Sequence, residues 1–534
     1  MRLPEIEKRE QLLATLFSES NLGYLFQRHF PNQCNDELEL IHTWHRIVRR
    51  EQDYWLSAIE VPDNIAKIRA LRENIYAALM CSMTRTPIFI LGKPGCSKSL
   101  TVSLLINALT DPWSDQLMHL ASFSVQPYQG SRQSTSSSLL QVFERALARQ
   151  KKLRTLKRRT RPLALVLLDE GGLAEQSPHN PLKVLHARLE PRRSQDAVSV
   201  IAISNWELDR SKLSRGLLLA CPPPSEADLL ETSLAIIRAY LAHETEIRNQ
   251  LERSLEPMAA AFMKILQEQT PRDFHGLRDW YGMCSFAARL LLAADVEMGW
   301  SSEEAKRGAL MHAVSDALSK EAAKLVQLCK ARQLQFVPAD WALEMAVLNN
   351  VSGNDQSRTL SKMLASLRRK QDEANHAMPI LHQIFPEVRH VSNCLDSLLG
   401  DVDGRHIMVI TDSPVPVIAW IQHRARLVGN WNPDCLVGSP LEHDQVSTDM
   451  YAQSMIQAAI VSMAQERRLL ILQNLDIIYA ALYDVFNSNY SRSSGPQSQR
   501  YCRIAREGFC NPRCAVADQF KAGSLSFWAV IHVA

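Results

Sequence analysis

Residues 87–100 read PIFILGKPGCSKSL and predict a strand, a loop and a helix in succession. The apolar run 88–91 is rich in strand formers and follows a Thr-Pro pair that ends the preceding helical pattern. The loop then fits the phosphate-binding Walker A pattern G-x-x-x-x-G-K-[ST] at every fixed position except the second glycine, where Ser97 stands. The alternative interpretation is a chance glycine-containing turn.

In a loop of this kind, backbone N–H groups and the N-terminus of the following helix face the phosphates of a nucleotide. Lys98 is then placed to reach the β- and γ-phosphates of ATP, and the Ser99 hydroxyl to ligate Mg²⁺. The residues expected to bind the nucleotide are Gly92, Pro94, Gly95, Cys96, Ser97, Lys98, Ser99 and Leu100.

A second element follows in the order that ATP hydrolysis requires. The apolar run LALVLL (163–168) predicts a buried parallel strand, and it ends in Asp169-Glu170, a Walker B pair at the carboxyl edge of the sheet. We expect Asp169 to hold Mg²⁺ together with Ser99, and Glu170 to orient and polarise the attacking water as the catalytic base. An isolated acidic pair after a strand is usually a solvated turn, but this pair follows a P-loop.

Three more residues are candidate catalytic groups. Asn205 ends the next strand, VSVIAIS (198–204), and is suited to contact the γ-phosphate or the water; the alternative is a turn-forming Asn. Arg215 could reach a neighbouring nucleotide as an arginine finger, whereas a surface arginine is the alternative. Arg278, in a helical region, could close onto the phosphates or form a structural ion pair with Asp279.

The pattern along the chain predicts four parts, the first of which is helical and covers residues 1–75. Residues 76–222 form an α/β domain with a doubly wound parallel sheet, and residues 223–395 form a helical lid with a polar linker near 350–372. A second, weaker α/β pattern covers 396–534, with strands expected at 406–411 and 468–475. We expect this last part to be truncated within its fold, after an apolar tail.

Composition limits the classes of function. The formal net charge of +3 is too small to demand nucleic acid or an anionic membrane as partner. The first residues lack the apolar core of a secretory signal, and no apolar run is long enough to span a membrane. Eleven scattered cysteines are typical of reduced thiols. A cytoplasmic location is therefore expected.

The second α/β pattern lacks the chemistry of the first. Thr411 to Pro414 stand where a P-loop would be, without a glycine cradle, and Gln473-Asn474 stand in place of Asp169-Glu170. Amides serve neither as a general base nor as anionic metal ligands. We expect this part to bind no nucleotide and to be a structural or regulatory neighbour.

The stretches PIFILGKPGCSKSL, VLLDEGGLAEQSPHNPLKVLH, IAISNWELDRSKLSRG and FHGLRDWY together resemble the third AAA+ module of the mysterin family, giant dynein-like ubiquitin ligases of the RING type. RHIMVITDSP, LVGSPLEHDQ and LLILQNLDIIYAALYDVFN resemble part of that family's fourth module, so the resemblance covers about 64–518. The family's own loop has serine at the position of Ser97. Gly171 departs from the family, where a larger apolar residue is usual.

The resemblance implies an AAA+ ATPase module that drives conformational change within such a ligase, with ATP and Mg²⁺ as its ligands. The family's zinc-binding ligase regions are expected to lie outside this chain, and the expected partners are neighbouring AAA+ modules and, through the parent protein, the ubiquitination machinery. In such arrays a following module supplies an arginine to the ATP site. We expect that arginine to come after residue 534, which would leave this chain binding ATP but hydrolysing it slowly.

Two other functions stay open. One is a scaffold gated by ATP binding with little turnover. The other is an ATPase stimulated by nucleic acid, which only the basic run RQKKLRTLKRRTR (149–161) favours; the run contains no aromatic residues for base stacking.

Overall fold

The structure is a computed structural model of the chain. The residues that it describes are 22–29, 37–110, 115–118, 120, 122–154, 163–190, 197–242, 245–269, 275–298, 316–331, 337–350, 391–400, 406–411, 413–439, 449–488, 490–492, 499–505 and 512–526. Asp412, most of the expected linker, the end of the basic run and the tail 527–534 lie outside these ranges.

The first sheet is parallel, with its five strands in the order β2-β3-β4-β1-β5. Its strands are β1 (Ile88–Leu91), β2 (Phe123–Gln129), β3 (Leu163–Asp169), β4 (Ser199–Ser204) and β5 (Leu217–Ala220). The helices of this first sheet unit are α4 (Arg69–Thr84), α5 (Lys98–Thr110), α6 (Asp115–Met118), α7 (Ser136–Arg154), α8 (Gly171–Glu175), η1 (Pro181–Val184), α9 (Leu185–Arg188) and α10 (Arg210–Leu213).

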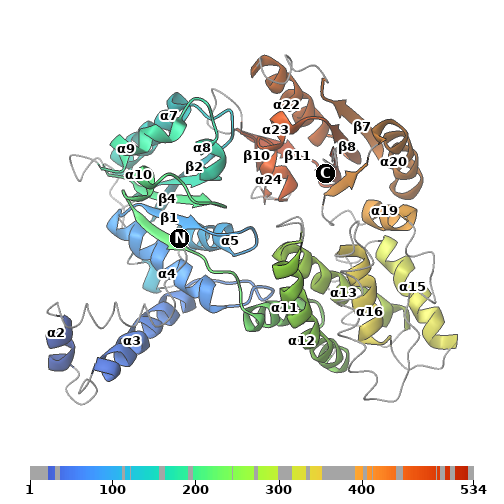
Figure 1. The fold of residues 1–534 in the computed structure, drawn as a ribbon, viewed down its shortest axis with the longest axis horizontal. Helices are drawn as coiled ribbons and strands as arrows, with labels where there is room; N and C mark the ends of the chain where they lie inside the picture. The colour runs from blue at the N-terminus through green and yellow to red at the C-terminus, as the bar shows by residue number, and fades with distance from the viewer. Residues whose placement is uncertain are drawn as a thin grey trace, which may run out of the picture.

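Helices cover both faces of this sheet. Side chains alternate along a strand, so Ile88 and Ile90 join the core formed with α4 and α5, whereas Phe89 and Leu91 join the core formed with α7 and α9. Every residue of β3 is buried, which explains its uninterrupted apolar sequence. The doubly wound α/β fold expected from the sequence is therefore present (Figure 1).

In the part of the chain that the structure describes, α2 (Leu22–His29) and α3 (Glu37–Ser57) precede the first sheet unit, and a helical unit follows it. The helical unit contains α11 (Glu226–Tyr240), α12 (Thr245–Glu268), α13 (Leu277–Met298), α15 (Asp316–Ala331), α16 (Ala339–Asn350) and α19 (Val391–Gly400). Buried residues of this unit belong to the same apolar core as α4 and α5, so the helical unit is packed against the sheet unit.

The second sheet unit has a parallel sheet with the order β6-β12-β8-β7. Its elements are β6 (Ile407–Ile410), α20 (Pro414–Gly429), β7 (Asn432–Val437), α22 (Asp449–Met463), β8 (Arg468–Gln473), α23 (Asp476–Tyr479), α24 (Tyr483–Phe486) and β12 (Phe520–Ser526). A small antiparallel sheet lies between β8 and β12 in the sequence, and its strands are β9 (Ser491–Arg492), β10 (Arg500–Arg503) and β11 (Arg513–Val516).

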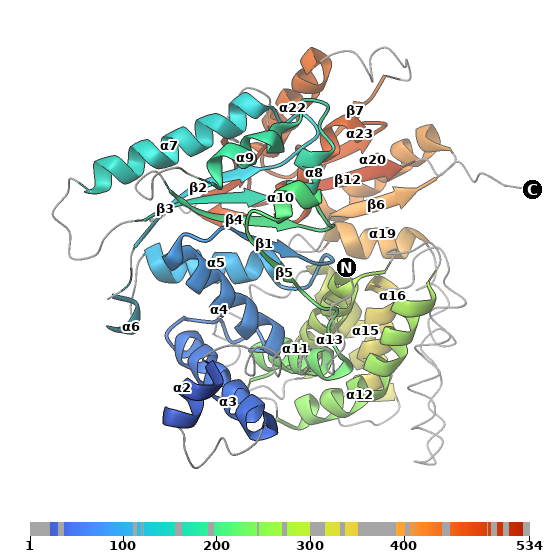
Figure 2. The same ribbon diagram turned by 60° about the vertical axis from the view of Figure 1, so that its left-hand side comes forward.

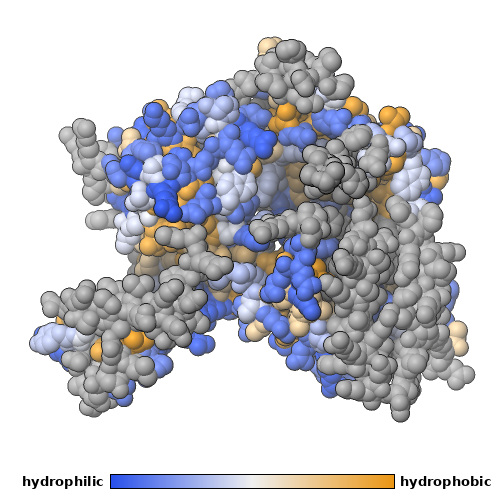
Figure 3. Space-filling view, viewed as in Figure 1, coloured by the Kyte–Doolittle hydropathy of each residue, from blue (hydrophilic) through white to orange (hydrophobic). Residues whose placement is uncertain are grey.

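The two sheet units lie side by side above the helical unit in both ribbon views (Figures 1 and 2). On the face drawn in Figure 3, hydrophilic side chains cover most of the first sheet unit, with apolar ones scattered among them. None of the described helices is long and apolar enough to cross a membrane.

Candidate nucleotide site

The phosphate-binding loop connects β1 to α5, at the carboxyl edge of the first sheet. Ser97 has a φ of +57°, so a serine adopts the left-handed conformation at the position where the motif usually has glycine. Gly95 has a φ of +91°, and a Cβ atom there would lie 2.7 Å from Cβ of Leu277 at the start of α13. The loop therefore packs tightly against the helical unit.

Lys98 is the first residue of α5, and it is 5% exposed. Its Nζ atom donates hydrogen bonds to the carbonyl oxygens of Gly92, at 2.5 Å, and Lys93, at 2.8 Å. Burial is the main cause that lowers the pKa of Lys98, and Arg278 also lowers it, whereas Glu170 opposes the shift. The ammonium group is thus held by the loop, and the charges of Glu170 and Arg278 both act on its pKa.

Asp169 is the last residue of β3, and Glu170 follows it in the left-handed conformation with a φ of +52°. Ser99 and Asp169 line one cavity of about 320 Å³. A hydroxyl and a carboxylate are oxygen donors of the kind that Mg²⁺ prefers, so these residues fit a magnesium ion. Burial raises the pKa of Asp169, and the neighbouring Arg503 opposes that shift.

Glu170 is 5% exposed and contacts Asn205 directly. The Asn205 amide donates to the carboxylate oxygens of Glu170 at 3.2 Å and 3.0 Å. Burial and the charge of Asp169 raise the pKa of Glu170 to about 7, while hydrogen bonds from Tyr483 and Asn205 and the charge of Lys98 lower it. A carboxylate with a pKa near neutrality can accept a proton from water at physiological pH.

Three residues of the second sheet unit also reach this edge, and we did not predict any of them from the sequence. Asn205 Nδ2 donates to the Tyr483 hydroxyl at 3.2 Å. Arg503 Nη2 contacts Asp169 Oδ2 at 3.2 Å, and Arg278 Nη1 donates to Asn487 Oδ1. Our expectation that a following module supplies its arginine from beyond residue 534 stays a prediction. Arg503 itself was not foreseen, because it is the last residue of β10, a strand that the apolar pattern does not reveal.

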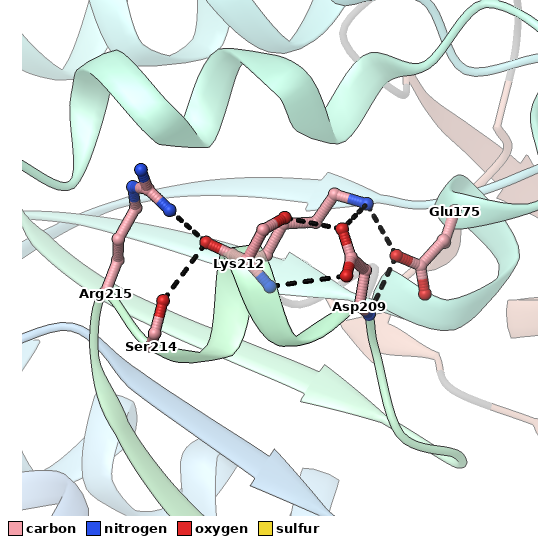
Figure 4. A network of polar contacts seen from close by, with 6 residues as sticks. Glu175, Asp209, Lys212, Ser214 and Arg215 are labelled. Carbon is pink, nitrogen blue, oxygen red and sulfur yellow. Dashed lines mark hydrogen bonds and ion pairs between the residues drawn. The ribbon is translucent and has the colours of Figure 1, made fainter.

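Arg215 lies at the opposite edge of the sheet. It lies two residues before β5, whose first residue, Leu217, pairs with Ile88 at the start of β1. Arg215 donates to the carbonyl of Ser211 and lies 3.4 Å from Glu190, next to the network of Glu175, Asp209 and Lys212 (Figure 4). Arg215 therefore does not join Lys98, Asp169 and Glu170, and its role as a finger for another site stays a prediction.

The second sheet repeats the geometry of the first without its chemistry. Asn474 follows β8 with a φ of +52°, as Glu170 follows β3, and Gln473 occupies the place of Asp169. The neighbouring strands β2 and β7 lead to Gly130 and Gly438. The Gly130 N–H donates to the Asp169 carbonyl and the Gly438 N–H donates to the Gln473 carbonyl, at 2.7 Å in both units. Gln473-Asn474 thus stand at the position that Asp169-Glu170 occupy in the first unit.

Comparison with known proteins finds two family models, each described as an RNF213 AAA domain, that match residues 64–228 and 396–523. Human E3 ubiquitin-protein ligase RNF213 is 27% identical over 518 residues, and zebrafish E3 ubiquitin-protein ligase rnf213-beta is 28% identical over 533 residues. These alignments cover 95% and 94% of this chain. The chain belongs to the RNF213 family. This confirms the resemblance to mysterin, which is the same family.

The chain spans 9% of the length of the human and zebrafish relatives. The first RNF213 AAA match contains the P-loop, Asp169, Glu170, Asn205 and Arg215, and the second contains Tyr483, Asn487 and Arg503. Arg278 lies between the two matches. The names of the models number these domains 4 and 5, whereas the resemblance placed them third and fourth.

Proposed function

We propose that this chain binds ATP with Mg²⁺ at the P-loop of the first sheet unit and hydrolyses it there. The observation that carries the proposal is that Lys98, Glu170 and Asn205 converge at one edge of the sheet. Glu170 lies within 3.2 Å of Asn205 and close enough to Lys98 to affect its pKa. In phosphoryl transfer to water the nucleophile is the water itself, so the protein must supply a base that orients it and a cation that binds the phosphates. Glu170, held by Asn205, is the base in this proposal, and Lys98 is the cation.

Each residue has a separate task in this proposal. The loop residues and Lys98 bind the β- and γ-phosphates, and Ser99 and Asp169 hold the metal, which supplies charge neutralisation of the phosphates. Glu170 orients the water and accepts its proton. Asn205 fixes the Glu170 carboxylate, because its amide contacts both carboxylate oxygens. Arg278 approaches from the helical unit, where closure of the lid would bring it to the phosphates.

Two side chains of the second sheet unit contact the residues to which these tasks are assigned. Tyr483 contacts Asn205, and Arg503 contacts Asp169. Arg503 is therefore our candidate for the arginine that a following AAA+ module contributes to the site. In phosphoryl-transfer enzymes such an arginine contributes about 10³- to 10⁵-fold to turnover.

At the level of the parent protein, we propose that ATP turnover drives a conformational change in a larger, cytoplasmic RNF213-type ubiquitin ligase. The ligase part of this proposal rests on the names of the relatives, which are E3 ubiquitin-protein ligases. The scaffold alternative predicts ATP binding without phosphate release. The nucleic-acid alternative predicts turnover that nucleic acid stimulates and that salt suppresses steeply.

The variant Glu170→Gln tests the proposal. The amide keeps the shape of the side chain but cannot accept the proton, so ATP should stay bound while phosphate release falls by about 10² or more. Phosphate release and ATP binding are measured on the whole chain. Glu175→Gln is the matched control, because Glu175 pairs with Lys212 on the same unit and lies outside the site. Normal turnover in Glu170→Gln would refute the role of Glu170, and no turnover in the unmodified chain would favour the scaffold.

A further inference from the structure

Arg503 connects the two sheet units through two carboxylates. Its Nε atom lies 2.8 Å from Asp484 Oδ2, and its Nη2 atom lies 3.2 Å from Asp169 Oδ2. Asp484 belongs to α24 of the same unit as Arg503, whereas Asp169 belongs to β3 of the first unit. One guanidinium group thus pairs with a carboxylate on each side of the junction.

The two ion pairs of Arg503 are largely shielded from water. The side chains of Asp484 and Asp169 are 2% and 9% exposed, and that of Arg503 is 19% exposed. Ion pairs with so little access to water are screened weakly by salt, and a carboxylate at such a site needs a cation nearby. Arg503 supplies that cation to Asp169.

The two ends of the bridge are not equivalent. Arg503 contacts Asp484 with two nitrogen atoms, Nε and Nη2, at 2.8 Å and 3.4 Å, but it contacts Asp169 with Nη2 alone. Asp169 is also the residue proposed to hold Mg²⁺. A divalent cation at Asp169 would stand beside the guanidinium group, and like charges a few ångströms apart repel each other. The contact of Arg503 with Asp169 is the weaker of the two, and it is the contact that a bound metal would break.

We propose that Arg503 is a positioning residue that occupies Asp169 in place of the metal, and that it leaves Asp169 but stays on Asp484 when a divalent cation binds. This inference rests on the proposed function of the first unit. It gives the second sheet unit, which has no carboxylate pair of its own at Gln473-Asn474, a way to respond to metal binding in the first. Arg503 and the metal then compete for one carboxylate.

If Arg503 and the metal compete for Asp169, a change at Arg503 should alter metal affinity in a direction that a purely structural ion pair would not predict. Removing the charge of Arg503 should strengthen metal binding, because Asp169 is then left without a cation. Arg503→Gln keeps a polar side chain of similar length, and we expect it to lower the dissociation constant of Mn²⁺ by about tenfold. Arg503→Lys keeps the charge and should stay within about threefold of the unmodified chain.

The experiment is a Mn²⁺ titration of the whole chain saturated with ADP, followed by electron paramagnetic resonance of free Mn²⁺. ADP is used because it lacks the γ-phosphate, so contacts of Arg503 with that group do not contribute. Arg513→Gln is the matched control: Arg513 pairs with Arg503 across β10 and β11 and lines the same cavity, but among the described residues no carboxylate pairs with it. The control should stay within about twofold of the unmodified chain.

Tighter Mn²⁺ binding in Arg503→Gln, with Arg503→Lys and Arg513→Gln near the unmodified chain, supports the proposal. Unchanged or weaker binding in a folded Arg503→Gln overturns it, while ADP binding still supports the proposed function. A chain that binds no ADP would overturn the proposed function and this inference together.

A measurement on the unmodified chain applies even if Arg503→Gln fails to fold. Hydrogen exchange of residues 499–505 is compared in ADP with a chelator and in ADP with Mn²⁺. Exchange should become faster with Mn²⁺, because the contact of Arg503 with Asp169 is lost. Unchanged or slower exchange on addition of Mn²⁺ contradicts the proposal.

Discussion

At the scale of single residues, the candidate site depends on backbone conformations as much as on side chains. Gly95, Ser97 and Glu170 all have positive φ angles, and they lie at the ends of β1 and β3. Only glycine adopts this region without a steric cost, so Ser97 and Glu170 are held there by their surroundings. The motif itself was predictable from the sequence. The conformation of Ser97 was not, since a serine gives no local signal for a positive φ.

Gly95 offers a test of this local geometry. In Gly95→Ala, the new methyl group would lie 2.7 Å from Cβ of Leu277, and the φ of +91° would disfavour any residue other than glycine. We expect the first unit to lose about 2 kcal/mol or more of its free energy of unfolding, and ATP binding to weaken, because the loop must move away from α13. Denaturant unfolding and ATP titration measure the two effects.

The matched control for Gly95→Ala is Gly276→Ala, at the residue just before Leu277. A Cβ atom there meets no atom within 4 Å, so stability should change little. Equal stability of Gly95→Ala and Gly276→Ala would show that the packing of the loop against α13 is not tight.

At the scale of elements, the sequence revealed the inner strands of the first sheet and missed its edge strands. The apolar runs at 88–91, 163–168 and 198–204 correspond to β1, β3 and β4, the three inner strands of the first sheet. Edge strand β2 is half-buried along most of its length and contains Pro127, so its sequence lacks a continuous apolar run. Strands β9 to β11 are short and polar, so they have no apolar run that would reveal them. Arg503, in β10, was missed for that reason.

The second sheet unit contains a partly buried histidine, His406, whose titration should make the stability of this unit depend on pH. Burial, and after it the charge of Lys521, lower the pKa of His406 to about 4. His406 Nδ1 accepts a hydrogen bond from the backbone of Ala522 at 3.0 Å, so the ring is held in its neutral form. In the unfolded chain the same group has a pKa near 6.5 and binds the proton more readily.

The unfolded state therefore gains protons relative to the folded state as the pH falls. The second unit should be most stable above pH 6.5 and should lose up to about 3 kcal/mol between pH 6.5 and pH 4. His406→Gln keeps an acceptor but does not titrate, so its stability should depend less on pH in this window. Urea unfolding at pH 7 and pH 5 measures the difference, and an identical pH dependence in the two proteins would contradict this assignment.

At the scale of the whole molecule, the two sheet units have the same architecture but different chemistry. The first unit presents Asp169 and Glu170 where the second presents Gln473 and Asn474. The second unit contributes Tyr483, Asn487 and Arg503 to contacts at the candidate site of the first. The sequence predicted an inactive neighbour. It could not predict that the neighbour's side chains lie at the candidate site, because contacts between residues 209 to 334 positions apart leave no local pattern.

The central claim is that one ATP site serves the whole chain and that Lys98 belongs to it. The most direct test counts bound ATP by equilibrium dialysis with Mg²⁺, using the Glu170→Gln background to prevent turnover. We predict one ATP for each chain, and none after Lys98→Ala is added, because that change removes the cation that the loop presents to the phosphates. Two ATP molecules for each chain, or undiminished binding after Lys98→Ala, would contradict the account.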